Sequence, residues 1–325
     1  MKKIINNLKY LSIVFFLLIS IGEQKAQSIG LDTLERAFFV GGLSPSILSE
    51  GKVEVNFYSS IYSSWLAIKQ SASDATVVDR LRLSEFSTNV ETYYGMSSTG
   101  RWDIGLRLNY VRRRLDNAAT SSPFKVLGGS DDEELNIGVD KTYSGFREIG
   151  LRLRFLPNRS IPELTLNGGY YFSAVKAEED QTYLAADRSR FDLNAAYYVS
   201  LNKSGTSYYY FLLNNIFAHP SAINDEWLLN TNISAFVVQR LAGRFVFYPG
   251  LSYGIGYKPP QVEGKTLIKT NQQVLAILGL QYEPSQNLNF NISWGIPLLI
   301  DSSNLLVDQV RASYTLVSIG ARYVY

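Results

Sequence analysis

The sequence predicts an all-β fold, a transmembrane antiparallel up-and-down β-barrel of twelve strands. Three observations support this prediction. The chain opens with a charged and then apolar leader, segments of alternating apolar and polar residues recur along it, and long connections alternate with short turns. After the leader, no stretch approaches the 18 consecutive apolar residues that would indicate a membrane-spanning helix, so any crossing must use strands.

The first 26 residues have the layout of a cleavable signal peptide. Lys2 and Lys3 precede an apolar run from Leu11 to Ile21, and small or polar residues follow up to Ala26. The run is shorter than the roughly 20 residues that cross a bilayer as a helix, so a permanent anchor is the weaker interpretation. We therefore divide the chain into a signal peptide (1–26), a periplasmic N-terminal segment (27–50) and a transmembrane β-barrel (51–325).

The composition restricts the class of protein further. Residues 1–26 carry four lysines and one glutamate, so their removal lowers the formal net charge from +2 to −1. A nearly neutral chain does not suggest nucleic-acid binding. The sequence has no cysteine, which excludes both a lipid on an N-terminal cysteine and a disulfide framework.

The strands are identified by a period of two, because residues two apart lie on the same face of a strand. From Trp102 to Tyr110 every second residue is apolar, whereas Asp103 and Arg107 belong to the other face. Tyr208–Ala218 has the composition of a strand, but its two faces are not distinct. The two-faced pattern recurs at Val53–Ile61, Ile149–Phe155, Leu164–Phe172, Phe191–Leu201, Trp227–Val237, Phe245–Tyr257, Val274–Tyr282 and Leu288–Leu298.

The connections between these strands distinguish a membrane barrel from a soluble sandwich, because membrane barrels alternate long outer loops with short periplasmic turns. We expect long segments at Ser64–Arg82, Leu115–Lys141, Lys176–Arg188, His219–Glu226, Lys258–Thr270 and Ile300–Asp308. Short turns with Gly, Pro, Asn and Ser lie at Met96–Gly100, Pro157–Pro162, Asn202–Thr206, Leu241–Gly243 and Pro284–Asn287. This alternation predicts twelve strands with both ends in the periplasm.

The last strand carries a terminal pattern. Ser318, Gly320, Tyr323 and Tyr325 fit a polar-x-Gly-x-x-aromatic-x-aromatic ending at the final residue. This ending resembles the C-terminal insertion signal of bacterial outer-membrane proteins. The resemblance implies that the barrel-assembly machinery recognises this strand during insertion. The alternative is an ordinary edge strand of a soluble protein.

If the apolar faces contact lipid, the opposite faces line a lumen with charges of both signs. Arginines on two neighbouring strands form a basic stripe, which would favour anions. The alternative is that carboxylates neutralise these arginines in a packed, closed interior. The candidate lumen-lining residues are Arg107, Arg113, Arg152, Arg154, Arg190, Glu91, Asp103 and Glu148, with Glu54, Asp192 and Arg244 on the same faces.

The predicted loops offer two weaker candidate sites. The acidic run Asp131–Glu134 could hold divalent cations near lipopolysaccharide, although a solvated loop is the simpler interpretation. The only histidine, His219, precedes Ser221 by two residues, a spacing that on a strand permits base-assisted nucleophilic attack. Pro220 between them breaks such a strand, and we expect no enzyme activity, no metal site and no cofactor.

The segment Thr99–Leu106 and the repeated aromatic strands resemble the phenol meta-pathway group of outer-membrane transporters. Membership would imply passage of small molecules, hydrophobic ones among them, across the outer membrane. The leader ending Gln24–Gln27 resembles those common in Bacteroidetes. We therefore expect a pore or transporter in the cell outer membrane, in contact with outer-membrane lipid and lipopolysaccharide. The alternatives are a closed structural or adhesive barrel and an outer-membrane lipid hydrolase.

Overall fold

The computed structural model describes most of the predicted barrel. The described residues are 47–325 except 73–74, 117–122, 128–140, 176–187, 203, 221–225, 242, 260–266 and 303–307. The predicted signal peptide and most of the segment 27–50 therefore lie outside the described residues. Among the residues that are described, no helix is long and apolar enough to cross a membrane.

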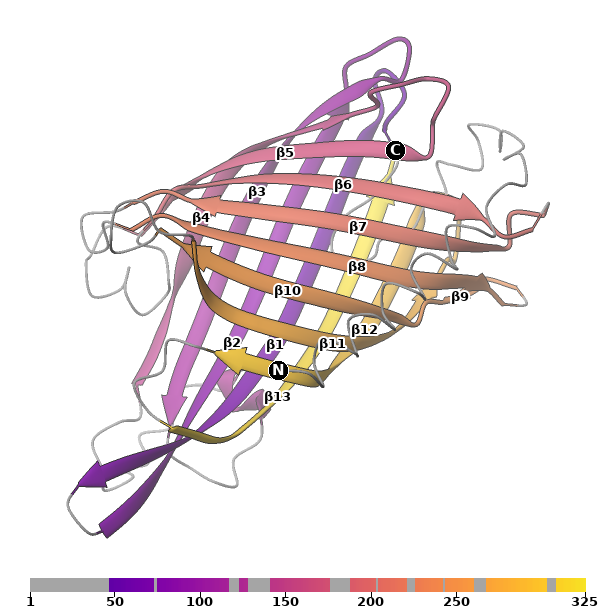
Figure 1. Ribbon diagram of the computed structural model, residues 1–325. Coiled ribbons are helices and arrows are strands. Elements are labelled where there is room, and N and C mark those ends of the chain that lie inside the picture. Colours follow the sequence, from indigo (N-terminus) through magenta and orange to yellow (C-terminus); the bar gives the residue numbers. More distant parts are fainter. Residues whose placement is uncertain are drawn as a thin grey trace.

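The described chain forms a single closed antiparallel sheet (Figure 1). Apart from β9 and β10, which do not pair with each other, each strand pairs with its neighbours in sequence, and β13 (Asp308–Val324) pairs with β1 (Val53–Ala72) to close the barrel, with Val55 opposite Tyr323. A short 3-10 helix, η1 (Pro123–Leu127), lies in the connection between β3 and β4. The strands are β1 (Val53–Ala72), β2 (Ala75–Gly95), β3 (Trp102–Asp116), β4 (Lys141–Phe155), β5 (Leu164–Ser173), β6 (Arg190–Ser200), β7 (Ser207–Ala218), β8 (Leu228–Arg240), β9 (Phe245–Phe247), β10 (Gly250–Lys258), β11 (Ile268–Tyr282), β12 (Leu288–Ser302) and β13 (Asp308–Val324).

The prediction of twelve strands is confirmed, because β9 and β10 are two parts of one strand. Both parts pair with β8 on one side and with β11 on the other. The interruption falls at Tyr248 and Pro249, where proline has no N–H to continue the ladder. The ring of Tyr248 points inward onto Gly279, where any Cβ would overlap it. The predicted strand Phe245–Tyr257 is therefore correct in extent but broken in its middle.

One predicted loop is wrong. The segment Ser64–Arg82 was expected to be a long connection, but β1 and β2 run through it as a paired hairpin up to Ala72 and Ala75. The segment contains no Gly or Pro, so nothing in it ends the pairing of the two strands. The hairpin extends well beyond the rest of the barrel, at the lower left of Figure 1. β4 is also longer than predicted, since it begins at Lys141 rather than Ile149.

The outer face of the barrel is apolar. Leu106, Leu151 and Ile319 are 52%, 54% and 52% exposed, whereas Asp103 and Arg152 on the opposite faces are at most 2% exposed. Exposed apolar side chains in this arrangement need a lipid environment, because water would penalise so large a continuous apolar band. The predicted alternation of apolar outer and polar inner residues is thus confirmed on these strands.

The two rims of the barrel differ in their connections. One rim carries the short turns 96–101, 156–163, 201–206, 241–244 and 283–287, and we call it the short-turn rim. Both ends of the barrel lie there, since the Val53 amide donates a 3.0 Å hydrogen bond to the Tyr325 carbonyl. Aromatic rings meet near it, with Phe245 and Tyr282 at 5.0 Å between centroids. The opposite rim, the long-loop rim, has its own aromatic pair, Phe217 and Trp227 at 5.8 Å. Such aromatic girdles mark the two membrane interfaces.

Candidate functional site

The barrel interior gathers the charged residues predicted to line the lumen, except Arg244, which is exposed in a turn at the short-turn rim. The guanidinium and carboxylate groups of β1 to β4, β6 and β13 meet there in three layers. The layers follow one another from the short-turn rim towards the long-loop rim, because Asp103, Arg107 and Arg113 succeed one another along β3. Glu91 lies opposite Arg107 and Glu85 opposite Arg113 on β2.

The first layer closes the interior next to the short-turn rim. Arg154 Nη1 lies 2.8 Å from Glu54 Oε1, and Arg154 Nε lies 2.8 Å from Asp103 Oδ1. Arg322, which the sequence analysis did not single out, lies 2.8 Å from the other oxygen of Glu54. The Arg154 guanidinium also covers the Tyr93 ring at 3.8 Å. None of these side chains is more than 3% exposed, so water does not pass between them.

The chain just before β1 completes this first layer. Leu48 is 3% exposed, and its backbone amide donates a 3.0 Å hydrogen bond to Asp103 Oδ2. The carbonyl of Ser49 lies against Gly95, where a Cβ would overlap it. The chain therefore reaches β1 from the interior side of the barrel.

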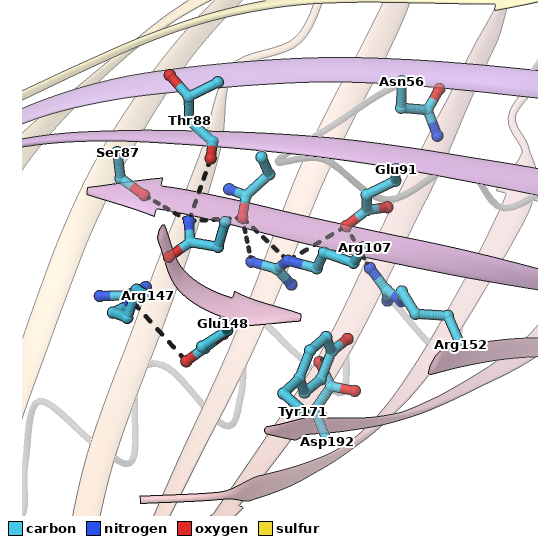
Figure 2. Close-up of polar contacts among 12 residues, drawn as sticks. Asn56, Ser87, Thr88, Glu91, Arg107, Arg147, Glu148, Arg152, Tyr171 and Asp192 are labelled. Atoms are coloured by element: carbon cyan, nitrogen blue, oxygen red, sulfur yellow. Dashed lines mark hydrogen bonds and ion pairs between the residues drawn. The ribbon is translucent and has the colours of Figure 1, made fainter. Parts of the chain in front are cut away.

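The second layer is centred on Glu91 (Figure 2). Its carboxylate lies 2.5 Å from Arg152 Nη1 and 3.6 Å from Arg107 Nε. Arg107 also donates hydrogen bonds of 2.9 and 2.7 Å to Asn89 Oδ1, and its guanidinium lies 5.2 Å from the centre of the Tyr171 ring. Arg152 is 2% exposed, but the side chain of Arg107 is 15% exposed, so the interior begins to open at this level.

The third layer lies nearer the long-loop rim and is partly open to water. Arg190 Nη2 lies 2.9 Å from Glu148 Oε2, and Arg113 Nε lies 2.5 Å from Glu85 Oε2. Arg147 lies between them, 3.7 Å from Glu148 and 3.6 Å from Glu85. The three arginine side chains are 15–20% exposed.

Arg147 and Glu85 were missed by the sequence analysis. By strict alternation Arg147 would share the outer face with Ile149, but the register shifts between Asn109 and Tyr110 of β3. Glu148 therefore pairs with Asn109 and Phe146 with Tyr110, which leaves Arg147 as an extra residue turned inward. No pattern in the sequence marks this bulge.

The arrangement of charges bears on the two alternatives for the lumen. Each arginine of the three layers lies within 3.7 Å of a carboxylate oxygen. The arginines therefore do not form an uncompensated basic stripe. They form a paired network that is sealed at the short-turn rim and partly hydrated towards the other end.

The opposite part of the interior is apolar near the short-turn rim, which the sequence analysis did not predict. An aromatic cluster on β6 to β10 is built from Ala196, Tyr198, Tyr208, Tyr210, Phe236, Val238, Val246 and Tyr248. The alternation of apolar and polar residues was not distinct in Tyr208–Ala218, because aromatic residues occupy both faces of this part of β7. The structure resolves it: Tyr208 and Tyr210 point inward at 7% and 1% exposure, and Leu213 points outward at 38%.

A cavity of about 250 Å³ opens at the short-turn rim. It lies between the turn that joins β8 to β9 and the turn that joins β11 to β12. Arg240 forms an ion pair of 2.7 Å with Glu283 in its wall, and Arg244, predicted to face the lumen, lines it as an exposed side chain. Most of its lining belongs to the two turns, and Asn289 is the buried residue in its wall.

The weaker candidates lie elsewhere or outside the described residues. His219 comes directly after the last residue of β7. Its ring packs against Phe217 and Tyr170, with 5.2 and 5.9 Å between ring centroids. Ser221 and the acidic run 131–134 are not among the described residues. In the part of the chain that the structure describes, no three His, Cys, Asp or Glu side chains come together as metal ligands.

The residues of the terminal pattern divide between the two faces of β13. Ser318 is 2% exposed and faces the interior, with Gly320 on the same face. Tyr323 and Tyr325 are 46% and 59% exposed on the outer face, with 6.0 Å between their ring centroids. The two aromatic side chains thus lie at the short-turn rim, where the barrel closes.

A closed antiparallel barrel of twelve strands, with an apolar outer surface, aromatic rims and a polar interior, has the architecture of a bacterial outer-membrane β-barrel. No protein-family model matches the sequence, and no curated protein matches it. The solved structures do show the fold. The barrel is similar to the COG4313 outer membrane channel from Pseudomonas putida F1, with a TM-score of 0.58 and 13% identity over 88% of this chain and 100% of that chain.

Two other barrels are less similar. The CymD monoaromatic hydrocarbon channel has a TM-score of 0.45 and 12% identity, covering 92% of this chain and 94% of its own. The beta domain of the Bordetella autotransporter BrkA has a TM-score of 0.49 and 12% identity, covering 83% of this chain and 99% of its own. At these identities the likeness is one of fold.

Proposed function

We propose that this protein is a channel for small molecules in the outer membrane, to which a cleavable signal peptide exports it. The observation that carries the proposal is the partly exposed third layer. Charged side chains inside a membrane barrel are costly unless they are paired or in contact with water. In the third layer both conditions are met, because Arg113, Arg147 and Arg190 are each paired with a carboxylate and their side chains are 15–20% exposed. An interior that served packing alone would not need such a layer.

The sealed first layer makes the proposed channel narrow and selective rather than wide. A solute that enters from the long-loop rim meets the open charged layer first and then the closed contacts of Arg154 with Glu54 and Asp103. The aromatic cluster fills the opposite wall at the same end. A side-chain rearrangement at this end is therefore part of the proposed transport step. The resemblance to the phenol meta-pathway transporters supports small molecules as the solutes.

Single-channel recording of the purified protein in planar bilayers tests this proposal. We expect discrete openings in KCl, with small conductance because of the sealed layer. Silence in a correctly folded preparation would overturn the channel and favour the alternative, a closed structural barrel. The observation that favours this alternative is the pairing of every interior arginine of the three layers with a carboxylate.

The third layer also predicts how single charges affect ion preference. Arg190→Gln leaves Glu148 without its 2.9 Å partner, so the anion-to-cation permeability ratio should fall about twofold at 0.1 M salt. Glu148→Gln should raise the ratio by a similar factor, which makes each variant the control of the other. Reversal potentials in a KCl gradient measure both. If both variants shift the permeability ratio in the same direction while the channel still opens, the third layer does not lie along the ion path.

We also propose that the terminal strand is an insertion signal for the barrel-assembly machinery. Changing Tyr323 and Tyr325 to Asp should leave little folded barrel in the outer membrane, because two charges would replace exposed rings at the membrane interface. Tyr→Phe at both positions keeps the rings and is the matched control. Fractionation and surface labelling measure the outcome, and normal amounts of the Asp variant in the outer membrane would refute the signal.

A further inference from the structure

Four asparagines form a row along the inner wall of the barrel, one on each of four neighbouring strands. Asn167 of β5 lies opposite Asn194 of β6, which lies opposite Asn214 of β7, which in turn lies opposite Asn232 of β8. With about 4.8 Å between strands, this asparagine row is about 14 Å long. Asparagine is disfavoured in strands, so four in register on adjacent strands need an explanation.

Hydrogen bonding within the row does not explain it. Neither polar atom of the Asn167 side chain has a hydrogen-bond partner within the described chain, and the same is true of the side-chain oxygens of Asn194 and Asn214. Asn167 and Asn194 are 1% and 2% exposed. Buried polar atoms without partners are rare in folded proteins, and they indicate bound water or a ligand. The row is therefore not a self-satisfied structural ladder.

The position of the row is also specific. It lies next to the aromatic cluster on its long-loop side, since Asn194 precedes Ala196 by two residues on β6 and Asn232 precedes Phe236 by four on β8. Asn214 and Asn232 are only half-buried, so the row reaches the open part of the interior. At that end the amide oxygen of Asn232 lies against Gly254, where a Cβ would overlap it.

We propose that the asparagine row is a binding track for neutral, hydroxyl-rich solutes of the saccharide class, an inference that rests on the proposed channel function. Each carboxamide offers two N–H donors and an acceptor oxygen without net charge. Hydroxyl groups are both donors and acceptors, so they match such a row and can partner its unpaired amide atoms. The neighbouring aromatic cluster provides an apolar surface for the C–H faces of a sugar ring.

Other solute classes fit the row less well. An aromatic hydrocarbon would displace water from the amides and leave their polar atoms unpaired, which is unfavourable. Among the described residues, an anion would find only one cation beside the row, Arg154 opposite Asn167, and that arginine is already paired with Glu54 and Asp103. A short peptide also carries donors and acceptors, and it is therefore tested beside the sugar.

The test is to titrate the KCl current of the reconstituted protein with maltotriose and, separately, with triglycine. We expect maltotriose to block the current of the wild-type protein. The double variant Asn194→Leu with Asn214→Leu keeps the branching and the number of heavy atoms of each side chain, and it should raise the half-blocking concentration about tenfold. Asn291→Leu is the matched control, because Asn291 is also a buried interior asparagine with an unpartnered amide nitrogen, but it lies on β12 outside the row.

The outcomes separate this inference from the channel itself. If maltotriose does not block the current, the track is overturned and the channel stands. The same holds if the double variant and Asn291→Leu change the half-blocking concentration equally, or if triglycine blocks more strongly than maltotriose. Absence of current overturns the channel, and calorimetric binding of maltotriose to the detergent-solubilised protein then decides the track. The mobility shift on boiling shows whether each variant is folded. If the double variant does not fold, the half-buried Asn232→Leu replaces it and should raise the half-blocking concentration severalfold.

Discussion

Replacing Arg154 with leucine is expected to destabilise the folded barrel by about 3–5 kcal/mol. Arg154 bridges Glu54 and Asp103 at 2.8 Å, and both carboxylates are 0% exposed. Its removal leaves Asp103 without a cation and Glu54 with Arg322 alone, in a layer whose side chains are at most 3% exposed. Urea unfolding of the reconstituted protein, followed by tryptophan fluorescence, measures the loss.

The matched control for this prediction is Arg244→Leu. Arg244 is an exposed arginine at the short-turn rim, with no ion pair among the described residues, so its replacement should change stability by less than about 0.5 kcal/mol. If the two variants unfold at the same urea concentration, the first layer is not the sealed contact described here. A correctly folded Arg154→Leu barrel with a larger conductance would agree with a constriction at this layer.

The second large effect is expected on the outer face. Leu106→Arg and Leu151→Arg should each cost about 2–4 kcal/mol of folding free energy if they lie near the bilayer midplane. The two leucines are direct cross-strand neighbours and more than half exposed to the surroundings of the barrel. The folded fraction after refolding into vesicles, read from the mobility shift on boiling, measures the cost.

Leu201→Arg is the control for depth in the membrane. Leu201 is 40% exposed at the end of β6 on the short-turn rim, where an arginine can reach the interface and should cost at most about 1 kcal/mol. Equal losses at Leu106 and Leu201 would show that the apolar band is misplaced. Full tolerance of arginine at Leu106 and Leu151 would show that the two faces are inverted.

The parts of the fold that could be predicted from sequence are those with a strict period of two. On β3, Leu106 lies on the outer face and Arg107 lies in the interior, because lipid selects apolar residues on one face along the whole strand. The short turns were also found, since tight reversals need Gly, Pro, Asn or Ser at few positions. The strand count followed from these turns, even though Pro249 breaks one strand in two.

The remaining features depend on contacts that alternation does not encode. The β-bulge that turns Arg147 inward changes the register by one residue and leaves no mark in the sequence around it. The aromatic cluster was not predicted, because the alternation of apolar and polar residues implies a polar interior on every strand. The asparagine row appears only when the registers of β5 to β8 are combined, because its members are separated by about 20 residues or more in sequence.

The central claim is that one sheet separates lipid from a polar interior, and site-directed spin labelling on β12 tests it most directly. The chain has no cysteine, so single cysteines can be introduced one by one from Asn289 to Trp294. Phe290, Ile292 and Trp294 are 45–51% exposed, whereas Asn289 and Asn291 are at most 6% exposed. Accessibility to oxygen dissolved in the bilayer should therefore alternate with a period of two, with maxima at positions 290, 292 and 294. A flat profile, or maxima at 289, 291 and 293, would contradict the barrel described here.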